Sequence, residues 1–147
     1  MAKKLPNRTA MIPHDEEKRY IMQLDVFHQL HCLNAIRKAL HPDYYTVSSQ
    51  PDPNDDGGVL EPHHIDHCVD TIRQSLMCNA DISPLTWMWD DERAKILAKG
   101  TIVHTCRRFD KIQEWASRYN YGKMMDSTQK AVNDPLDPET WTEGFSG

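Results

Sequence analysis

Two copies of one short motif hold the residues of this chain that could do chemistry. HQLHC spans residues 28–32 and HIDHC spans residues 64–68, so both read H-x-x-H-C, and an Ile-Arg pair follows each motif. Residues three apart lie on one face of a helix, with Cβ atoms about 5–6 Å apart, so each motif can aim two imidazoles at one point. Two such helices packed face to face would bring four imidazoles together, which suits a metal ion.

The predicted metal ligands and catalytic residues are therefore His28, His31, His64 and His67. Without a metal, four clustered imidazoles would each need a hydrogen-bond partner and would repel one another when protonated, so we favour ligands over core histidines. Imidazole suits copper, zinc, iron and nickel. The helix strip that carries the second pair holds no carboxylate, which argues against a facial-triad iron site.

Four cysteines complicate the choice of metal, and they are Cys32, Cys68, Cys78 and Cys106. As thiolates they would be alternative ligands and would favour zinc or cuprous copper; as disulfides they would leave an all-imidazole site, which fits redox-active copper. Each motif cysteine points about 100° away from the imidazole before it, towards the apolar side of its helix. We therefore favour disulfide formation or buried packing over ligation.

The two motif helices must position these side chains. The first is expected to begin at the N-cap Asp25 and to end near His41, before a proline. Its histidines share a broad sector with small and apolar residues, Cys32, Ala35, Ile36, Ala39 and Leu40. The loop that follows, residues 42–60, is rich in turn formers. It opens with Tyr44 and Tyr45, which either approach the site as hydrogen-bond donors or simply pack.

The second motif helix is expected to begin at Pro62. Its core stripe comprises Ile65, Cys68, Val69, Ile72 and Leu76, and a separate small polar strip comprises His64, His67, Thr71, Ser75 and Cys78. Thr71 and Ser75 are therefore candidate pocket residues, whereas His63 falls outside the strip and is expected to be exposed. From this difference we expect the second helix to line the open side of the site and the first to clamp it from the core.

Later elements are less clearly specified. Residues 85–90 suit an extended segment with Trp87 and Trp89 on one side, either packed in the core, which we favour, or forming a pocket wall. A short helix is expected from Asp90 or Asp91 to Lys99. A last helix is expected over about 102–119, with a buried side of Cys106, Phe109, Ile112, Trp115 and Ala116. His104 is a further candidate ligand or proton-transfer group, although a lone histidine is more often structural.

Bulk properties predict one domain of the mainly α class. We expect a small helical domain with the two H-x-x-H-C helices packed face to face around a metal site, long loops and at most a few short strands. Within residues 1–147 we expect an extended N-terminal segment over 1–19, a helical core over 20–120, and a tail over 121–147 anchored by Trp141 and Phe145. A formal charge of −5 argues against nucleic acid as a partner, and no apolar run approaches the length of a membrane span.

The paired motifs, together with LMCNAD at 76–81 and HTCRRFD at 104–110, resemble the UstYa-like family of fungal secondary metabolism. That resemblance implies oxidative tailoring of a peptide, such as a ribosomally made one, or of a small natural product, by cyclisation, hydroxylation, desaturation or halogenation at a C–H position. It also implies one or two copper ions, with zinc as the alternative metal and dioxygen as co-substrate. The matching motif residues are His28, His31, Cys32, His64, His67 and Cys68.

Partners and location follow from the same resemblance. Family members commonly carry an N-terminal membrane anchor that is missing from this chain, so we expect the secretory-pathway lumen if an anchor precedes it natively, and a soluble cytoplasmic protein otherwise. A homo- or heterodimer is also considered. Two other functions stay open, namely a non-redox cyclase or isomerase that uses a metal or histidine acid–base chemistry, and a non-enzymatic module whose helices zinc staples together.

Overall fold

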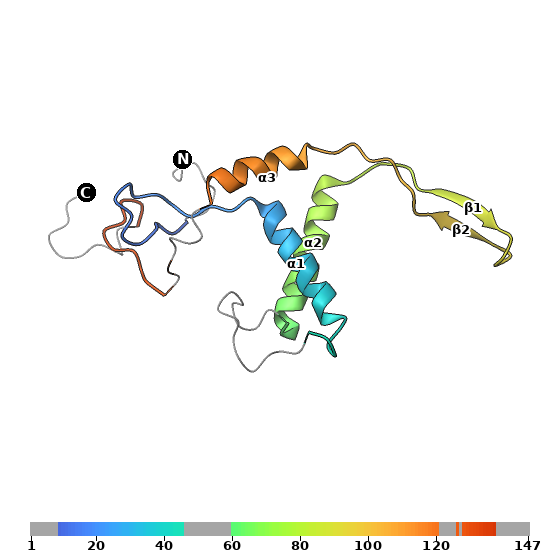
Figure 1. Cartoon of the computed structure of the whole chain (residues 1–147), viewed down its shortest axis with the longest axis horizontal. Helices are drawn as coiled ribbons and strands as arrows, with labels where there is room; N and C mark the ends of the chain where they lie inside the picture. Colours follow the sequence, from blue (N-terminus) through green and yellow to red (C-terminus); the bar gives the residue numbers. More distant parts are fainter. Residues whose placement is uncertain (1–8, 46–59, 121–125, 127, 138–147) are drawn as a thin grey trace. The chain divides into compact units, whose positions relative to one another are not determined.

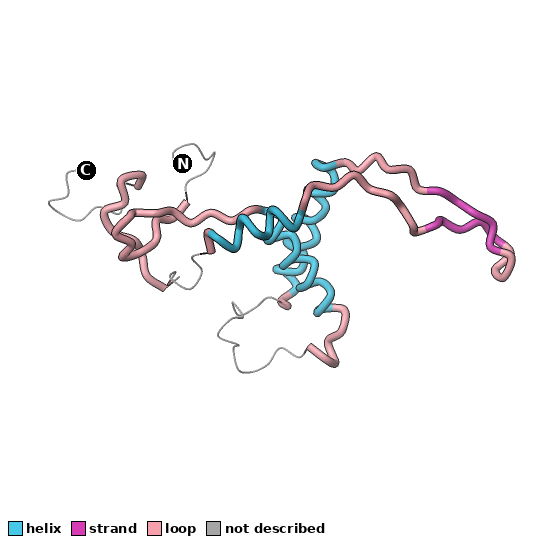
Figure 2. Tube along the Cα trace, turned by 45° about the horizontal axis from the view of Figure 1, so that its top comes forward, coloured by secondary structure: helices cyan, strands magenta, loops and turns pink. Residues whose placement is uncertain are grey.

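The computed structural model describes residues 9–45, 60–120, 126 and 128–137 of the 147-residue chain. In chain order its elements are α1 (Asp25–Ala39), α2 (Pro62–Asn79), β1 (Thr86–Asp90), β2 (Lys95–Lys99) and α3 (Phe109–Arg118) (Figure 1). Helices and loops dominate, with a single pair of strands in the part described (Figure 2), so the prediction of a small, mainly α fold is confirmed. None of the helices in this part of the chain is long and apolar enough to cross a membrane.

The chain divides into two compact units, which are described separately. One unit comprises Met1–Leu24 and Asp110–Gly147, and the other comprises Asp25–Phe109. The sequence predicts segment boundaries after residues 19 and 120, whereas these units divide after Leu24 and after Phe109. Both H-x-x-H-C motifs lie in the second unit, which therefore contains the whole candidate site.

Helices α1 and α2 begin where the sequence predicts, and they pack against each other. Pro62 occupies the first turn of α2, where its missing N–H costs nothing. Ala80 closes α2 in a left-handed conformation (φ 37°), and its N–H donates to the carbonyl of Leu76 at 2.9 Å. Three residues, Cys32, Ala35 and Cys68, are fully enclosed between the helices, with Ile36, Ile65 and Ile72 packed beside them.

The core stripe predicted for α2 is only partly confirmed. Cys68 is buried and Ile65 and Ile72 are half-buried, but Val69 and Leu76 are exposed. The close contact between α1 and α2 lies at Ala35, and it covers only a narrow sector of α2. The wider apolar sector of α2 therefore stays uncovered in the described part of the unit.

Residues 90–99 form the end of β1, a turn and the whole of β2 in a β-hairpin, so the short helix expected over this segment is wrong. Thr86–Asp90 pairs in antiparallel register with Lys95–Lys99, and Ala94 turns the chain with a positive φ of 47°. The extended segment with two tryptophans on one side is confirmed as β1. Trp87 and Trp89 are nevertheless 62% and 59% exposed, so they do not pack in a core. Pairing with a neighbouring strand overrides the weak helical preference of so short a segment.

Helix α3 begins at Phe109, seven residues later than the predicted start at 102. The segment before it contains Thr101, Ile102, Val103 and Thr105, whose β-branched side chains lose freedom in a helix. Asp110 in the first turn complements the helix dipole and supports the later start. The predicted buried side is also wrong, because none of the five residues named for it is buried.

The N-terminal segment and the segment after α3 belong to one unit, in which a short turn forms the centre. Met11 and Tyr20 form an isolated antiparallel bridge, and both Met11 and Ile12 are buried. The phenol of Tyr20 donates to the buried carboxylate of Asp134 at 2.5 Å, which ties the later segment to the turn. The proposed tail anchors, Trp141 and Phe145, lie outside the described residues.

We expect the substitution Tyr20→Phe to lower the free energy of unfolding by about 1–3 kcal/mol, because the buried carboxylate of Asp134 loses one of its hydrogen-bond donors. Burial, together with Asp134, raises the pKa of Tyr20 from 10.0 to about 12. The neutral phenol therefore contributes stability that is complete below pH 10.0 and is lost as pH rises through about 12. Denaturant unfolding at increasing pH should show this loss in the wild type and a smaller one in Tyr20→Phe; equal losses would contradict the assignment.

Candidate metal centre

The four motif histidines form a closed ring of neighbours between α1 and α2. Across the helices, the ring centroids of His28 and His67 lie 5.6 Å apart, and those of His31 and His64 lie 5.8 Å apart. Within each helix, His28 and His31 are 6.4 Å apart, and His64 and His67 are 6.2 Å apart. The earlier histidine of one motif faces the later histidine of the other, so the two helices run in opposite directions past the site.

Each helix contributes one half-buried and one exposed imidazole. His28 and His64 are half-buried, whereas His31 and His67 are exposed. The expectation that the second helix lines the open side while the first clamps it from the core is therefore wrong. Because the helices run in opposite directions, the half-buried histidine of each helix faces the exposed histidine of the other. Both helices therefore contribute to the site in the same way.

His64 provides the clearest sign of a missing partner. Its Nε2 atom is buried, and among the described residues it is the one buried side-chain nitrogen or oxygen atom without a hydrogen-bond partner. Such an atom costs about 1–3 kcal/mol unless something binds it. A metal ion at the centre of the histidine ring is a partner of the right chemistry, so the donor set fits an imidazole-bound metal.

Carboxylates flank the ring from outside. Asp25 Oδ1 lies 3.7 Å from His28 Nδ1. The pKa of Asp70 is lowered mainly by hydrogen bonds from Arg73 and Gln74, with a smaller contribution from the charge of His67. At 3.7 Å, Asp25 is a charged neighbour of His28 rather than a hydrogen-bond partner, and Asp70 is hydrogen-bonded to Arg73 and Gln74.

The motif cysteines lie together beneath the imidazoles. Cys32 and Cys68 are both 0% exposed and belong to one buried cluster. Burial, together with the neighbouring Cys32, raises the pKa of Cys68 to about 12, so its thiol stays protonated and is a weak ligand. Cys32 Sγ also lies 3.8 Å from His28 Nε2. All four cysteines are free thiols in the structure, and Cys78 and Cys106 are exposed.

The ring is more open than a finished metal site. Within the described ranges, no group of three or more His, Cys, Asp or Glu side chains is already arranged to hold an ion. Metal–nitrogen bonds of about 2.0–2.1 Å allow two imidazole centroids on one ion to lie at most roughly 6.5 Å apart. Each neighbouring pair satisfies this limit, whereas four ligands on a single ion require the rings to rotate inwards.

The other predicted site residues are distributed differently. Thr71 and Ser75 are half-buried on α2, about one and two turns beyond His67, and their pocket role stays a prediction. Tyr44 and Tyr45 stack edge to face just past α1, where Arg37 donates to the Tyr45 hydroxyl at 2.8 Å. The hairpin carries Trp87 and Trp89. These four aromatic residues are not among the ring contacts of the histidine cluster.

His104 is not brought to the histidine ring. Its Nδ1 atom is bonded to the carboxylate of Asp81, two residues past the end of α2. Hydrogen bonds from Ser83 and then from His104 lower the pKa of Asp81 to about 2. Asp81 follows His67 by fourteen residues, and α2 alone separates them by roughly 18 Å at about 1.5 Å per residue. Sequence reasoning could not find this pair, because its members are 23 positions apart.

We therefore expect His104→Ala to leave the metal-to-protein ratio unchanged. The substitution removes the bond to Asp81 at the base of the hairpin, so a small loss of stability is expected instead. Elemental analysis of the dialysed variant beside the wild type measures the ratio directly. A fall in bound metal would place His104 among the ligands after all.

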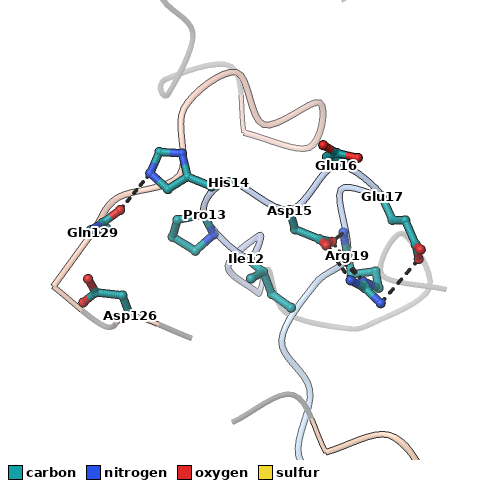
Figure 3. Close-up of a pocket in the computed structure, with 9 residues that line it drawn as sticks. All are labelled: Ile12, Pro13, His14, Asp15, Glu16, Glu17, Arg19, Asp126 and Gln129. Atoms are coloured by element: carbon teal, nitrogen blue, oxygen red, sulfur yellow. Dashed lines mark hydrogen bonds and ion pairs between the residues drawn. The ribbon is translucent and has the colours of Figure 1, made fainter. Parts of the chain in front are cut away.

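A second concave site lies in the other unit. This pocket has a volume of about 590 Å³ (Figure 3) and is lined by the turn residues 12–17, Arg19, Asp126 and Gln129. The side chain of Asp15 is almost fully buried and accepts hydrogen bonds from the backbone and guanidinium of Arg19. His14 Nε2 is bonded to Gln129 at 2.8 Å. These groups hold the turn together, so the histidine ring is the stronger candidate for chemistry.

Comparison with known proteins identifies relatives of this chain. A family model described as "Mycotoxin biosynthesis protein UstYa" matches residues 2–118, which include both motifs. The UstYa family oxidase phomYc' of Diaporthe leptostromiformis is 43% identical over 97 residues, which cover 63% of this chain and 37% of that protein. The UstYa family oxidase VicYb of Bipolaris victoriae is 32% identical over 97 residues, which cover 66% of this chain and 79% of that protein.

A third relative, the oxidase ustYa of Aspergillus flavus, is 32% identical over 113 residues, which cover 76% of this chain and 45% of that protein. The chain thus spans little more than a third of phomYc'. No solved structure matches the chain.

Proposed function

Because this chain belongs to the UstYa family of mycotoxin biosynthesis proteins, we propose that it is a copper-dependent oxidase that tailors a peptide or small natural product at a C–H position. Relatives named as oxidases support the reaction class. Copper, dioxygen as co-substrate, and the substrate class are parts of this proposal. Cyclisation, hydroxylation, desaturation and halogenation are the outcomes it covers.

The observation that carries the proposal is the ring of four imidazoles with one buried, unpartnered nitrogen. Ring centroids 5.6–6.4 Å apart put each histidine within reach of a metal shared with its neighbours. The Nε2 atom of His64 has no other partner. Ligation would remove the cost of that buried atom, so the site gains from binding a metal in a way that a set of packed histidines does not.

The donor set favours copper for oxidative chemistry. Four imidazoles suit copper or zinc, and the nearby carboxylates lie outside the ring rather than in it. Copper supplies one-electron chemistry and a binding position for dioxygen, which zinc does not.

The chain's own residues have distinct tasks in this proposal. His28 and His64 would hold the ion on its inner side, while His31 and His67 would hold it beside the solvent, where a substrate can approach. Asp25 would place a negative charge 3.7 Å from Nδ1 of His28. The fully enclosed Cys32, Ala35 and Cys68 keep water out from below.

A zinc-stapled, non-enzymatic module is the second candidate, and the small interior between the helices favours it. Only Cys32, Ala35 and Cys68 are buried there among the described residues, so a metal could supply much of the stability of the pair. Such a module would need four protein ligands and no open position.

Oxygen uptake separates the two candidates. The protein is prepared metal-free, loaded with copper or with zinc, and mixed with a reductant and a library of linear peptides and natural products. The proposal predicts substrate-dependent oxygen consumption and a mass change in the product for the copper form alone. Equal products from the zinc and copper forms, or stability restored by zinc without any oxygen consumption by the copper form, would contradict an oxidase.

A further inference from the structure

We propose that Cys32 and Cys68 form a disulfide that fastens α1 to α2 directly beneath the four imidazoles. This modification does not depend on the proposed function, because it follows from the packing of two thiols and not from any metal. It would make the helix pair a covalently closed scaffold, in which the two H-x-x-H pairs stay opposed even when no metal is bound.

The shared burial of the two cysteines is the main observation. Both cysteines are 0% exposed, and they belong to one buried cluster between α1 and α2. A disulfide needs an S–S distance of about 2.05 Å and Cβ atoms about 3.5–4.5 Å apart. Two cysteines enclosed in the same cluster, one from each of two packed helices, are placed to reach this geometry.

The alternative pairings are weaker. Cys78 lies ten residues after Cys68 on the same helix, which ends at Asn79, so the two are separated by roughly 15 Å along α2, beyond the reach of a disulfide. Cys78 and Cys106 are both exposed, in contrast to the enclosed pair. Cys68 is therefore the one other buried cysteine, and it lies in the same cluster as Cys32.

The bond would form by exchange with a small-molecule disulfide such as oxidised glutathione. One cysteine attacks the reagent, which forms a mixed disulfide and releases one molecule of reduced glutathione. The second cysteine then attacks the mixed disulfide and releases the second molecule of reduced glutathione. The two cysteines lose two electrons and two protons, which appear in the two thiols released. Because both sulfurs are enclosed once the helices pack, exchange must occur while the helices are apart, and the finished bond is then shielded from reductants.

Peptide mapping of the full chain tests the proposal. The protein is produced in an oxidising compartment, purified without reductant, alkylated under denaturing conditions and digested with trypsin. We expect the peptide over residues 20–37 to be joined to that over 39–73, and to separate after reduction. Alkylation of both motif cysteines before any reduction, or a bond from Cys32 to Cys78 or Cys106, would overturn it.

A pair of double variants then measures what the bond does. Cys78→Ser/Cys106→Ser should keep the cross-linked peptide and should melt about 10 °C lower when refolded with reductant than without, as the wild type should. Cys32→Ser/Cys68→Ser should show no such difference. If this second variant does not fold, the wild type refolded with and without reductant still decides, because equal melting temperatures would contradict a stabilising bond.

Discussion

Replacement of His64 by alanine is expected to lower the copper affinity of this chain at least about 100-fold and to abolish oxidase activity. His64 is the half-buried histidine whose Nε2 atom has no other partner. It also neighbours both His31, at 5.8 Å, and His67, at 6.2 Å, so its loss opens the ring of imidazoles on two sides. Changes to groups that merely orient a ligand already cost about 10–100-fold in metal affinity, and loss of a ligand should cost more. Isothermal titration of the metal-free variant with copper gives the affinity.

His63→Ala is the matched control for this experiment. His63 precedes His64 on the same helix, but its side chain is 80% exposed and lies 3.3 Å from Glu61. The same substitution one position earlier should therefore leave copper affinity and activity within about twofold of the wild type. If both variants lost copper affinity and activity equally, α2 would face the site with a different side from the one seen in the structure.

Ala35→Leu is expected to lower the free energy of unfolding by about 1–3 kcal/mol, because a larger side chain does not fit between the helices. Ala35 is buried between α1 and α2, beside Cys32 and Cys68. Three extra carbons there must push the helices apart, which should also weaken metal binding by separating the opposed histidines. Denaturant unfolding followed by circular dichroism measures the first effect, and copper titration measures the second.

Leu33→Ala provides the comparison on the same helix. Leu33 is 56% exposed, so its truncation should change the stability by no more than about 0.5 kcal/mol. If Leu33→Ala cost as much as Ala35→Leu, the close contact between α1 and α2 would not lie on the face that carries the cysteines.

The site could be predicted because its signals are local. The three-residue spacing within each motif places both imidazoles on one helix face, and Asp25 and Pro62 mark the helix starts. The same periodicity correctly placed His63 outside the cluster. A repeated motif also predicts that its copies meet, and the structure does bring the four rings together.

The rest could not be predicted because it depends on contacts between distant residues. Lys95–Lys99 is a strand only because Thr86–Asp90 is available to pair with it. His104 is held by Asp81 rather than by the histidine ring, and nothing in the residues around it indicates that partner. The direction in which the two helices pass each other is likewise invisible in the sequence, and it determines that each helix contributes one inner and one outer histidine.

X-ray absorption spectroscopy of the copper-loaded protein tests the metal centre most directly. This account predicts a first coordination shell of nitrogen donors with the scattering pattern of imidazole, and no sulfur, because the two motif cysteines are enclosed in their own cluster beneath the ring. A sulfur shell at about 2.3 Å, the distance typical of thiolate ligands, or a shell without imidazole scattering would contradict it.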